Sequence, residues 1–408
     1  MRTYRELFRT PEFTPLFLTS AAQIAAQTVS GLALGTLVFT ATGSPLLAAL
    51  ALFGPSLAQV VGAATLLSAA DRLSPRAAMT GLALLFGLGT AVQVLPGMPL
   101  WASFAVLLGL GMVAALGGGV RYGLLNEILA KDGYLLGRSA LNMCAGSMQI
   151  GGFALGGVLV ATLSPRGTLL VGAGLYLCAA AVARCGLSRR APRAEGRPSI
   201  AHTWRNNARL WSSRPRRAVY LALWVPNGLV VGCESLFVPY APAQAGLLFA
   251  SAACGMLLGD IVVGRFVPRH RRGRLGIPLL ALLAAPYLLF ALHPPLPVAL
   301  ALTALASVGF AASLVQQEQL MALTPDELSG HALGLHTSGM LTMQGVGAAL
   351  AGGIAQLTSV TTALAVTAVL SLAVTAALAP RLRAGRPNSP APSRTSTVTP
   401  AYVPADGS

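Results

Sequence analysis

The chain has 408 residues, of which 54% are hydrophobic and only 10% are charged, and its formal net charge is +16. A soluble globular protein carries about 25% charged residues, so this composition predicts an integral membrane protein. The sequence contains no Gly-Lys pair for a P-loop, no Gly-x-Ser-x-Gly elbow, no Cys-x-x-Cys and no His-Glu-x-x-His motif. We therefore expect a protein that is not an enzyme, with no catalytic residue, metal site or cofactor.

Charge clusters and Pro/Gly/Ser turns divide the apolar sequence into twelve stretches. Each is long enough to cross a hydrocarbon core about 30 Å thick. The predicted spans are 13–40, 46–69, 77–95, 100–120, 139–162, 168–187, 218–240, 243–264, 275–292, 297–317, 332–357 and 362–379. The first apolar stretch is too long for the core of a signal peptide, so it is expected to be retained.

Basic residues lie almost entirely on one side of this arrangement. That side holds Arg2, Arg5, Arg9, Arg72, Arg76, Arg121, Lys131, Arg138, and the arginines of 184–217, 265–274 and 381 onward, whereas the other side holds Arg166 alone. Because basic loops remain cytoplasmic, both termini are predicted to be cytoplasmic in a bacterial inner (plasma) membrane. Membrane orientation and anionic lipid explain the clusters, so nucleic-acid binding is not expected.

The basic stretch in the middle of the chain separates two halves. We predict an N-terminal six-helix bundle (1–187), a basic cytoplasmic linker (188–217), a C-terminal six-helix bundle (218–380) and a disordered cytoplasmic tail rich in Pro, Ser and Thr (381–408). Trp204 and Trp211 in the linker are equally consistent with a short amphipathic helix on the inner leaflet and with a solvated loop.

The two halves are similar to each other at a shift of 195 to 197 residues. At the larger shift Gly31, Gly35 and Pro45 align with Gly228, Gly232 and Pro242, and at the smaller shift Met148-Gln149 aligns with Met343-Gln344. Spans 5 and 11 are therefore equivalent, which predicts a duplicated six-helix unit of the kind common in transporters.

The segment Leu67 to Arg76, between spans 2 and 3, contains Asp71, Arg72 and Arg76. It resembles the motif Gly-x-x-x-Asp-Arg-x-Gly-Arg-Lys/Arg of the major facilitator superfamily, although both glycines are missing. The equivalent loop of the second half, Gly264 to Arg272, keeps the glycine and has Pro268 in place of the aspartate. In span 5, Gly152-Phe153-Ala-Leu-Gly156-Gly157 is similar to the Gly-Pro-x-x-Gly-Gly of the family's exporters. The family's basic span-4 motif is not found, because Gly109 to Gly119 carries no arginine.

This resemblance, to the drug-exporter-like branch of the family, covers about Phe13 to Arg383. It implies an all-α integral membrane fold with twelve transmembrane helices in two pseudo-symmetric six-helix bundles, and a cytoplasmic gate that includes Asp71, Arg72 and Arg76. Asp260 and Arg265, at the inner end of span 8, are predicted to pair at the same gate. Small-x-x-x-small spacing predicts close helix crossings at Gly31/Gly35, Gly152/Gly156 with Gly157, Gly228/Gly232 and Gly255/Gly259.

Glu234 is the clearest ionisable residue within a span, where such a group costs about 2.5 to 3.5 kcal/mol on insertion scales. A carboxyl that is buried in one conformation and reached by water in another has the behaviour of a proton-coupling site. The alternatives are a protonated glutamate bonded to a neighbouring helix and a carboxylate hydrated at the outer interface.

Several amides add polar groups to the spans. Gln23 and Gln27 are four residues apart on one face of span 1, Asn227 lies in span 7, and Gln149 and Gln344 are equivalent positions. In the family, spans 1, 4, 7 and 10 surround the cavity, so Gln23, Gln27, Asn227 and Glu234 are the predicted cavity residues, with Gln149 and Gln344 beside them. Hydrogen bonding between helices explains the glutamines equally well, and His336 is more typical of a packing residue.

The predicted function is transport by alternating access: proton-coupled export of a small hydrophobic or amphiphilic compound by a monomeric antiporter, as in multidrug efflux. The partners are the substrate, protons and membrane lipid. A solute importer of the same fold and a non-transporting membrane sensor are the alternatives. A membrane-embedded enzyme would need clustered His, Asp or Arg at a membrane face, which the sequence lacks.

Overall fold

The computed structural model describes residues 4–70, 74–129, 131–190 and 200–384. Within these ranges all regular secondary structure is helical, and there is no strand. Eleven helices are long and apolar enough to cross a membrane. The chain is therefore an all-α multi-pass membrane protein.

One of these eleven helices crosses the membrane twice. The helix α6 (Lys131–Gly186) has 56 residues, and a straight helix of that length would be about 80 Å long. Ser164 inside it has φ 71° and ψ 163°, and Pro165 follows. Val29 and Ser30 of the neighbouring helix lie against Gly156 and Gly172, eight residues to either side of Ser164. The chain therefore reverses at Ser164, and the predicted twelve crossings are confirmed.

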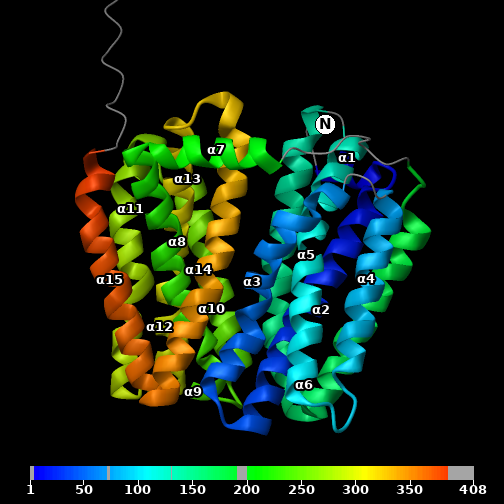
Figure 1. The fold of residues 1–408 in the computed structure, drawn as a ribbon, viewed down its shortest axis with the longest axis horizontal. Coiled ribbons are helices and arrows are strands. Elements are labelled where there is room, and N and C mark those ends of the chain that lie inside the picture. The colour runs from blue at the N-terminus through cyan, green and yellow to red at the C-terminus, as the bar shows by residue number, and fades with distance from the viewer. Residues whose placement is uncertain (1–3, 71–73, 130, 191–199, 385–408) are drawn as a thin grey trace, which may run out of the picture.

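The helices form two groups that stand side by side (Figure 1). The N-terminal bundle consists of α2 (Phe13–Thr42), α3 (Pro45–Ala70), α4 (Pro75–Val92), α5 (Leu100–Ile128) and α6, preceded by α1 (Tyr4–Arg9). The C-terminal bundle consists of α8 (Arg214–Ser235), α9 (Phe237–Tyr240), α10 (Ala245–Ile261), α11 (Arg269–Ala284), α12 (Leu296–Val308), α13 (Ala312–Ala322), α14 (Ser329–Leu357) and α15 (Val360–Ala384).

Several C-terminal helices contain or adjoin turns that are not α-helical. A π-helical turn, Val262–Phe266, ends α10, and a 3-10 segment, Ala285–Leu292, completes the span begun by α11. A short 3-10 turn, Gly309–Ala311, joins α12 to α13, so these two form one crossing. Another, Asp326–Leu328, precedes α14.

The helix α5 is longer than the sequence predicts, and this changes the position of one arginine. The predicted span ends at residue 120, but α5 continues to Ile128 because Leu124 and Leu125 extend its buried apolar face. Arg121, which we expected in a loop beside the cytoplasmic arginines, therefore lies inside the fourth span. The segment Gly109 to Gly119 itself carries no arginine, but the span extends beyond that segment and includes Arg121.

The linker contains a helix, α7 (Ile200–Ser212), which runs across one end of the molecule (Figure 1). Asn206 and Leu210 are buried on one face of α7, and Arg205 and Arg209 are exposed on the other. Trp211 stacks on Trp224 of α8, with ring centroids 5.6 Å apart. Of the two alternatives for this segment, the structure has the amphipathic helix.

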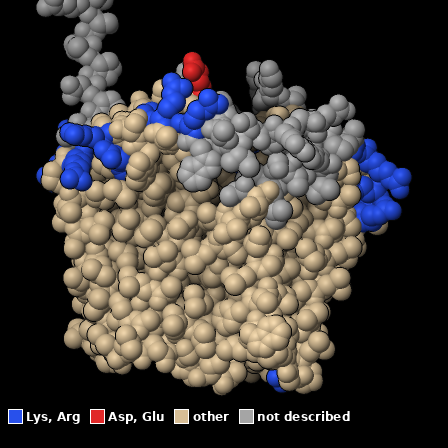
Figure 2. Space-filling model, in the orientation of Figure 1, with Lys and Arg blue, Asp and Glu red and all other residues tan. Residues whose placement is uncertain are grey.

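Charge is concentrated at the same end of the molecule. We call this end, which carries α1, α7 and the arginines of 184–190, 205–217, 265–274 and 381–383, the basic face, and the other end the opposite face. Figure 2 shows a wide band between the two ends whose surface, on the side drawn, has neither basic nor acidic side chains. Such an uncharged belt is what a bilayer requires.

Glycines determine how closely the helices approach within each bundle. A Cβ added to Gly232 of α8 would lie 2.5 Å from the carbonyl oxygen of Gly347 on α14, and one added to Gly259 of α10 would lie 2.5 Å from that of Val308. In the N-terminal bundle a Cβ on Gly152 would lie 2.9 Å from Thr28. A Cβ on Gly31, by contrast, would have no atom within 4 Å, so this position is open and not a close crossing.

Gly347→Val tests the crossing of α8 and α14. A side chain there would overlap the carbonyl of Gly228, so the helices must separate and stability should fall by about 1–3 kcal/mol or more. Gly353→Val on the same helix is the control, because a Cβ at Gly353 has no atom within 4 Å. Thermal unfolding in detergent should show a clearly lower transition for Gly347→Val alone; equal transitions would contradict this description of the crossing.

Candidate functional site

The closest contacts between the two bundles lie toward the opposite face. Leu57 of α3 packs against Gly345 of α14, and Gly352 lies against Leu46 near the start of α3. Just before α3 begins, the Ser44 hydroxyl donates to Oε1 of Gln356, near the end of α14, at 2.8 Å. The bundles are thus joined along the part of α3 and α14 farthest from the basic face.

The second pair of helices between the bundles shows the same pattern. Phe153 of α6 stacks on Phe249 of α10, with ring centroids 4.7 Å apart. A Cβ on Gly157 would lie 3.0 Å from Cα of Gly246, so the two backbones touch there. Nearer the basic face, Gly146 meets only the end of the Leu257 side chain, at 3.8 Å.

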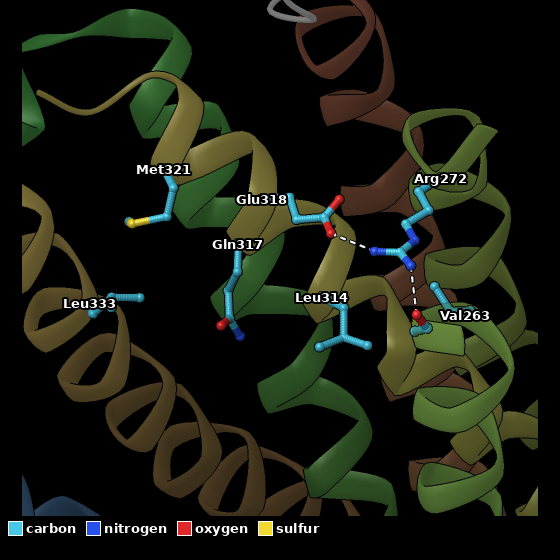
Figure 3. Close-up of a pocket in the computed structure, with 8 residues that line it drawn as sticks. Val263, Arg272, Leu314, Gln317, Glu318, Met321 and Leu333 are labelled. Atoms are coloured by element: carbon cyan, nitrogen blue, oxygen red, sulfur yellow. Dashed lines mark hydrogen bonds and ion pairs between the residues drawn. The ribbon is translucent and has the colours of Figure 1, made fainter. Parts of the chain in front are cut away.

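A cavity of about 580 Å³ lies in the C-terminal bundle toward the basic face (Figure 3). Its wall is formed by the end of α10 and by α11, α13 and α14, through Val263, Gly264, Arg272, Leu314, Gln317, Glu318, Met321 and Leu333. Most of these side chains are apolar, and the polar groups are concentrated at one side. This cavity can accommodate a small, partly hydrophobic molecule.

Arg272 organises the polar side of this cavity. Its Nη1 donates to Oε1 of Glu318 at 2.8 Å, and its Nε and Nη2 donate to the carbonyls of Val267 and Gly264 at 2.9 and 2.6 Å. The guanidinium therefore satisfies backbone groups at the π-helical turn and ties α11 to α13 (Figure 3). It holds three acceptors at once, which gives a fixed geometry.

The predicted cytoplasmic gate is only partly within the described residues. Asp71 and Arg72 lie outside them, and Arg76 is in the first turn of α4, where its Nε is buried without a hydrogen-bond partner. Among the described residues no ion pair joins Asp260 to Arg265, whose side chain is exposed. The expected pairing is therefore wrong for this conformation. Arg272 and Glu318 form an ion pair at this end instead, and their separation in sequence hid it.

Glu234 lies one residue before the end of α8, near the opposite face, and only 8% of it is exposed. Its Oε1 is buried without a hydrogen-bond partner, and no ion pair involves it among the described residues. The buried hydroxyl of Tyr287 is within electrostatic range of this carboxyl. The structure thus encloses Glu234 in the C-terminal bundle instead of exposing it in the open cavity.

The other predicted polar residues fall into two separate groups. In the C-terminal bundle, Nε2 of Gln344 donates to Oδ1 of Asn227 at 3.2 Å, which is the bond between helices allowed for in the sequence analysis. In the N-terminal bundle, Gln23 accepts a long hydrogen bond of 3.4 Å from Nη2 of Arg121. Gln27 is exposed one turn further along α2.

Gln149 lies on the side of α6 that faces the other bundle. It is exposed, and it shares a helical face with Gly146 and Phe153, which contact α10. His336 of α14 is buried, and its Nε2 lies 3.5 Å from Nε2 of Gln317 on the cavity wall. Arg121 was missed in the sequence analysis because the predicted fourth span ends at residue 120, directly before this arginine, whereas α5 continues to Ile128. A test of helical continuity through Leu124 and Leu125 would have found it.

Comparison with solved structures establishes the fold. A bacterial homologue of the human lysosomal transporter Spinster, in an inward-facing and unoccupied conformation, superposes with a TM-score of 0.70 at 14% identity, over 96% of this chain and all of that one. A POT family transporter in complex with 5-aminolevulinic acid gives 0.74 at 10% identity, over 91% and 96% of the two chains. The nucleoside transporter NupG gives 0.71 at 14% identity, over 91% and 99%. The chain therefore has the fold of these transporters.

Sequence comparison adds a narrower result. The family model of the Major Facilitator Superfamily matches residues 239–404, which is less than half of the chain. No protein of curated function matches the sequence. The resemblance to the superfamily inferred from the loop motifs is thus supported by the C-terminal half, whereas nothing supports its drug-exporter branch.

Arg272→Gln tests the organisation of the cavity wall. Two backbone carbonyls and one carboxylate lose their donor, and the loss of such bonds in a partly buried place should cost about 1–3 kcal/mol. Glu318→Gln removes only the half-exposed partner, so it should cost less than about 1 kcal/mol. Thermal unfolding of both variants in detergent measures the difference. A Glu318 variant as unstable as the Arg272 variant would show that the ion pair, and not the backbone bonds, is what matters.

Proposed function

We propose that the protein is a secondary transporter of the major facilitator type that works by alternating access. The observation that carries this proposal is the position of the close contacts between the bundles: Gly157 meets Gly246 and Gly352 meets Leu46 toward the opposite face, whereas the cavity toward the basic face is lined, within the described residues, by the C-terminal bundle. An interface joined at one end opens at the other. By the positive-inside rule the basic face is cytoplasmic, so this conformation is open to the cytoplasm and both termini lie there.

Small residues at the interface between the bundles support this mechanism. Gly157 meets Gly246 backbone to backbone, and Gly345 and Gly352 receive side chains of α3. Such contacts are close without interlocking long side chains, so the bundles can separate and meet again. The inward-facing state of the Spinster homologue with the same fold agrees with this orientation.

A disulfide between the bundles tests alternating access. An added Cβ on Gly345 would lie 2.8 Å from Cδ2 of Leu57, so Leu57→Cys with Gly345→Cys places two thiols within bonding reach. Oxidation should trap the molecule open to the cytoplasm and abolish transport in vesicles, and reduction should restore it. The two single variants under the same oxidant are the controls. Transport that continues with the disulfide formed would refute the mechanism.

We further propose that Glu234 carries the coupled proton. An ionised carboxylate in a membrane helix requires a partner for its charge, and the enclosed Glu234 has none among the described residues. A proton supplies that partner while the opposite side is closed, and the hydroxyl of Tyr287 lies within electrostatic range of the carboxyl. Opening of the bundles at the opposite face would bring water to the end of α8 and release or reload the proton.

Export of a small hydrophobic or amphiphilic compound follows from the mostly apolar cavity wall, and proton entry would drive it. The compared transporters include ones named for nucleosides and for peptides, and import is the competing direction. Substrate accumulation in inverted vesicles with an acidic lumen indicates proton-driven export, and accumulation in right-side-out vesicles indicates import. Transport in neither would favour a membrane sensor or assembly partner.

Glu234→Gln separates proton coupling from movement of the substrate. The variant cannot ionise but keeps the shape of the side chain, so accumulation driven by a pH gradient should fall by more than about tenfold, while exchange of labelled for unlabelled substrate at equilibrium continues. Glu127→Gln is the matched control, because the side chain of Glu127 is 30% exposed at the basic face and is not among those that line the cavity. An unchanged pH dependence in Glu234→Gln would assign coupling elsewhere.

A further inference from the structure

We propose that Arg121 is the centre of a binding site for an anionic oxygen group, a carboxylate or a phosphate, on the transported molecule. This inference rests on the proposed transport function and names its class of substrate. It departs from a cationic substrate, which Glu234 alone would suggest. The site lies in the N-terminal bundle, away from the cavity around Arg272.

The first observation is that Arg121 lacks a counter-ion. It lies within the fourth span, seven residues before the end of α5, and its Nε is buried without a hydrogen-bond partner. None of the ion pairs formed by the described residues involves it. Its single hydrogen-bond partner is the neutral amide of Gln23, at 3.4 Å. A guanidinium offers five donors, so most of its bonding capacity is free.

The second observation is that this arginine adjoins open space. Gln23, Gln27 and Gly31 follow one another at four-residue spacing on one face of α2. Gln27 is exposed, and nothing lies within 4 Å of a Cβ at Gly31, so this face is open. Two amides and a guanidinium facing lipid would be costly. We therefore infer that this space is the aqueous cavity between the bundles.

The third observation is that other polar groups converge on the same place. Tyr122, the next residue along α5, donates to Oδ1 of Asn142 at 3.2 Å. Asn142 and Gln149 lie on the face of α6 that meets α10 further down, through Phe153 and Gly157. Tyr122, Asn142 and Gln149 carry no negative charge, and no carboxylate of the described residues pairs with Arg121, so an anion bound to Arg121 meets no competing ion pair there.

The geometry of Arg121 favours a flat or tetrahedral oxyanion over a halide. A guanidinium binds a carboxylate or a phosphate through two parallel N–H bonds, which adds direction to the attraction of charge. The apolar cavity wall on the other bundle would accept the remainder of the molecule. The predicted substrate is thus an amphiphilic anion that lies between the two bundles.

The test measures binding to the purified full-length protein in detergent, at constant ionic strength and without any gradient. The probes are 4-phenylbutyrate and phenyl phosphate, with 4-phenylbutanamide and 4-phenylbutylamine as neutral and cationic counterparts. Affinity is obtained from the dependence of the thermal transition on ligand concentration. The variants are Arg121→Gln and Arg121→Lys. Arg138→Gln is the control, because it removes an exposed arginine that stacks over the Tyr122 ring, 5.5 Å from its centroid.

Wild-type protein should bind at least one anionic probe and neither counterpart. Arg121→Gln should weaken that binding by about tenfold or more, Arg121→Lys by less, and Arg138→Gln hardly at all. A preference for phenyl phosphate over 4-phenylbutyrate, or the reverse, identifies the group. If Arg121→Gln does not fold, the weaker binding of Arg121→Lys carries the test.

Two results would overturn the proposal: equal affinity in wild type and both Arg121 variants, or no anionic probe that binds better than the amide. The outcome is independent of transport, because binding is measured in detergent without any gradient. Anion binding with no movement in vesicles would refute the transport proposal and leave this site in place. Transport of neutral compounds with no anion binding would refute this site and leave the transport proposal in place.

Discussion

Close backbone contact between helices is the constraint on which this structure depends. In a lipid core there is no gain from burying apolar surface, so helices associate through van der Waals packing and a few hydrogen bonds. The crossing of α8 with α14 leaves no space for a Cβ at Gly228 or Gly347. Close backbone contact at glycines also joins the two bundles, at Gly157 and Gly246 toward the opposite face. The structure therefore has two closely packed bundles that also touch along α3 with α14 and along α6 with α10.

The polar groups inside the spans are distributed unevenly between these two bodies. The C-terminal bundle encloses the carboxyl of Glu234 near the closed end of the interface, whereas the N-terminal bundle holds the guanidinium of Arg121 nearer the basic face. Neither has an ionic partner among the described residues. An unpaired charge is expensive in a membrane, and this cost is the physical basis of the two proposals made for these groups. A proton suits the enclosed acid, and an anionic ligand suits the base beside the open space.

Much of the fold follows from the sequence because length and hydropathy govern membrane spans so strongly. Each of the twelve predicted spans falls on one helix, on consecutive helical segments of one crossing, or on half of α6. The reversal at Ser164 occurs beside Pro165, within the predicted loop. The ends of the spans are harder to predict from the sequence. A single arginine inside an apolar helix lowers the local hydropathy as a loop does, so the predicted fourth span ends before Arg121. The side chain of Gln23 accepts a bond from this arginine, and that partner could be known only from the structure.

The candidate site was less predictable than the fold, and for a physical reason. Repeat symmetry identified Gln149 and Gln344 as equivalents, yet one faces the other bundle and the other bonds to Asn227 within its own. The two copies of an ancestral unit therefore place the same amide in different surroundings once their neighbours diverge. The loop arginines also differ in their partners: Arg272 bonds to Val267, Gly264 and Glu318, whereas Nε of Arg76 has no hydrogen-bond partner. Symmetry thus predicts the positions of side chains, whereas their partners decide whether a position serves packing, gating or binding.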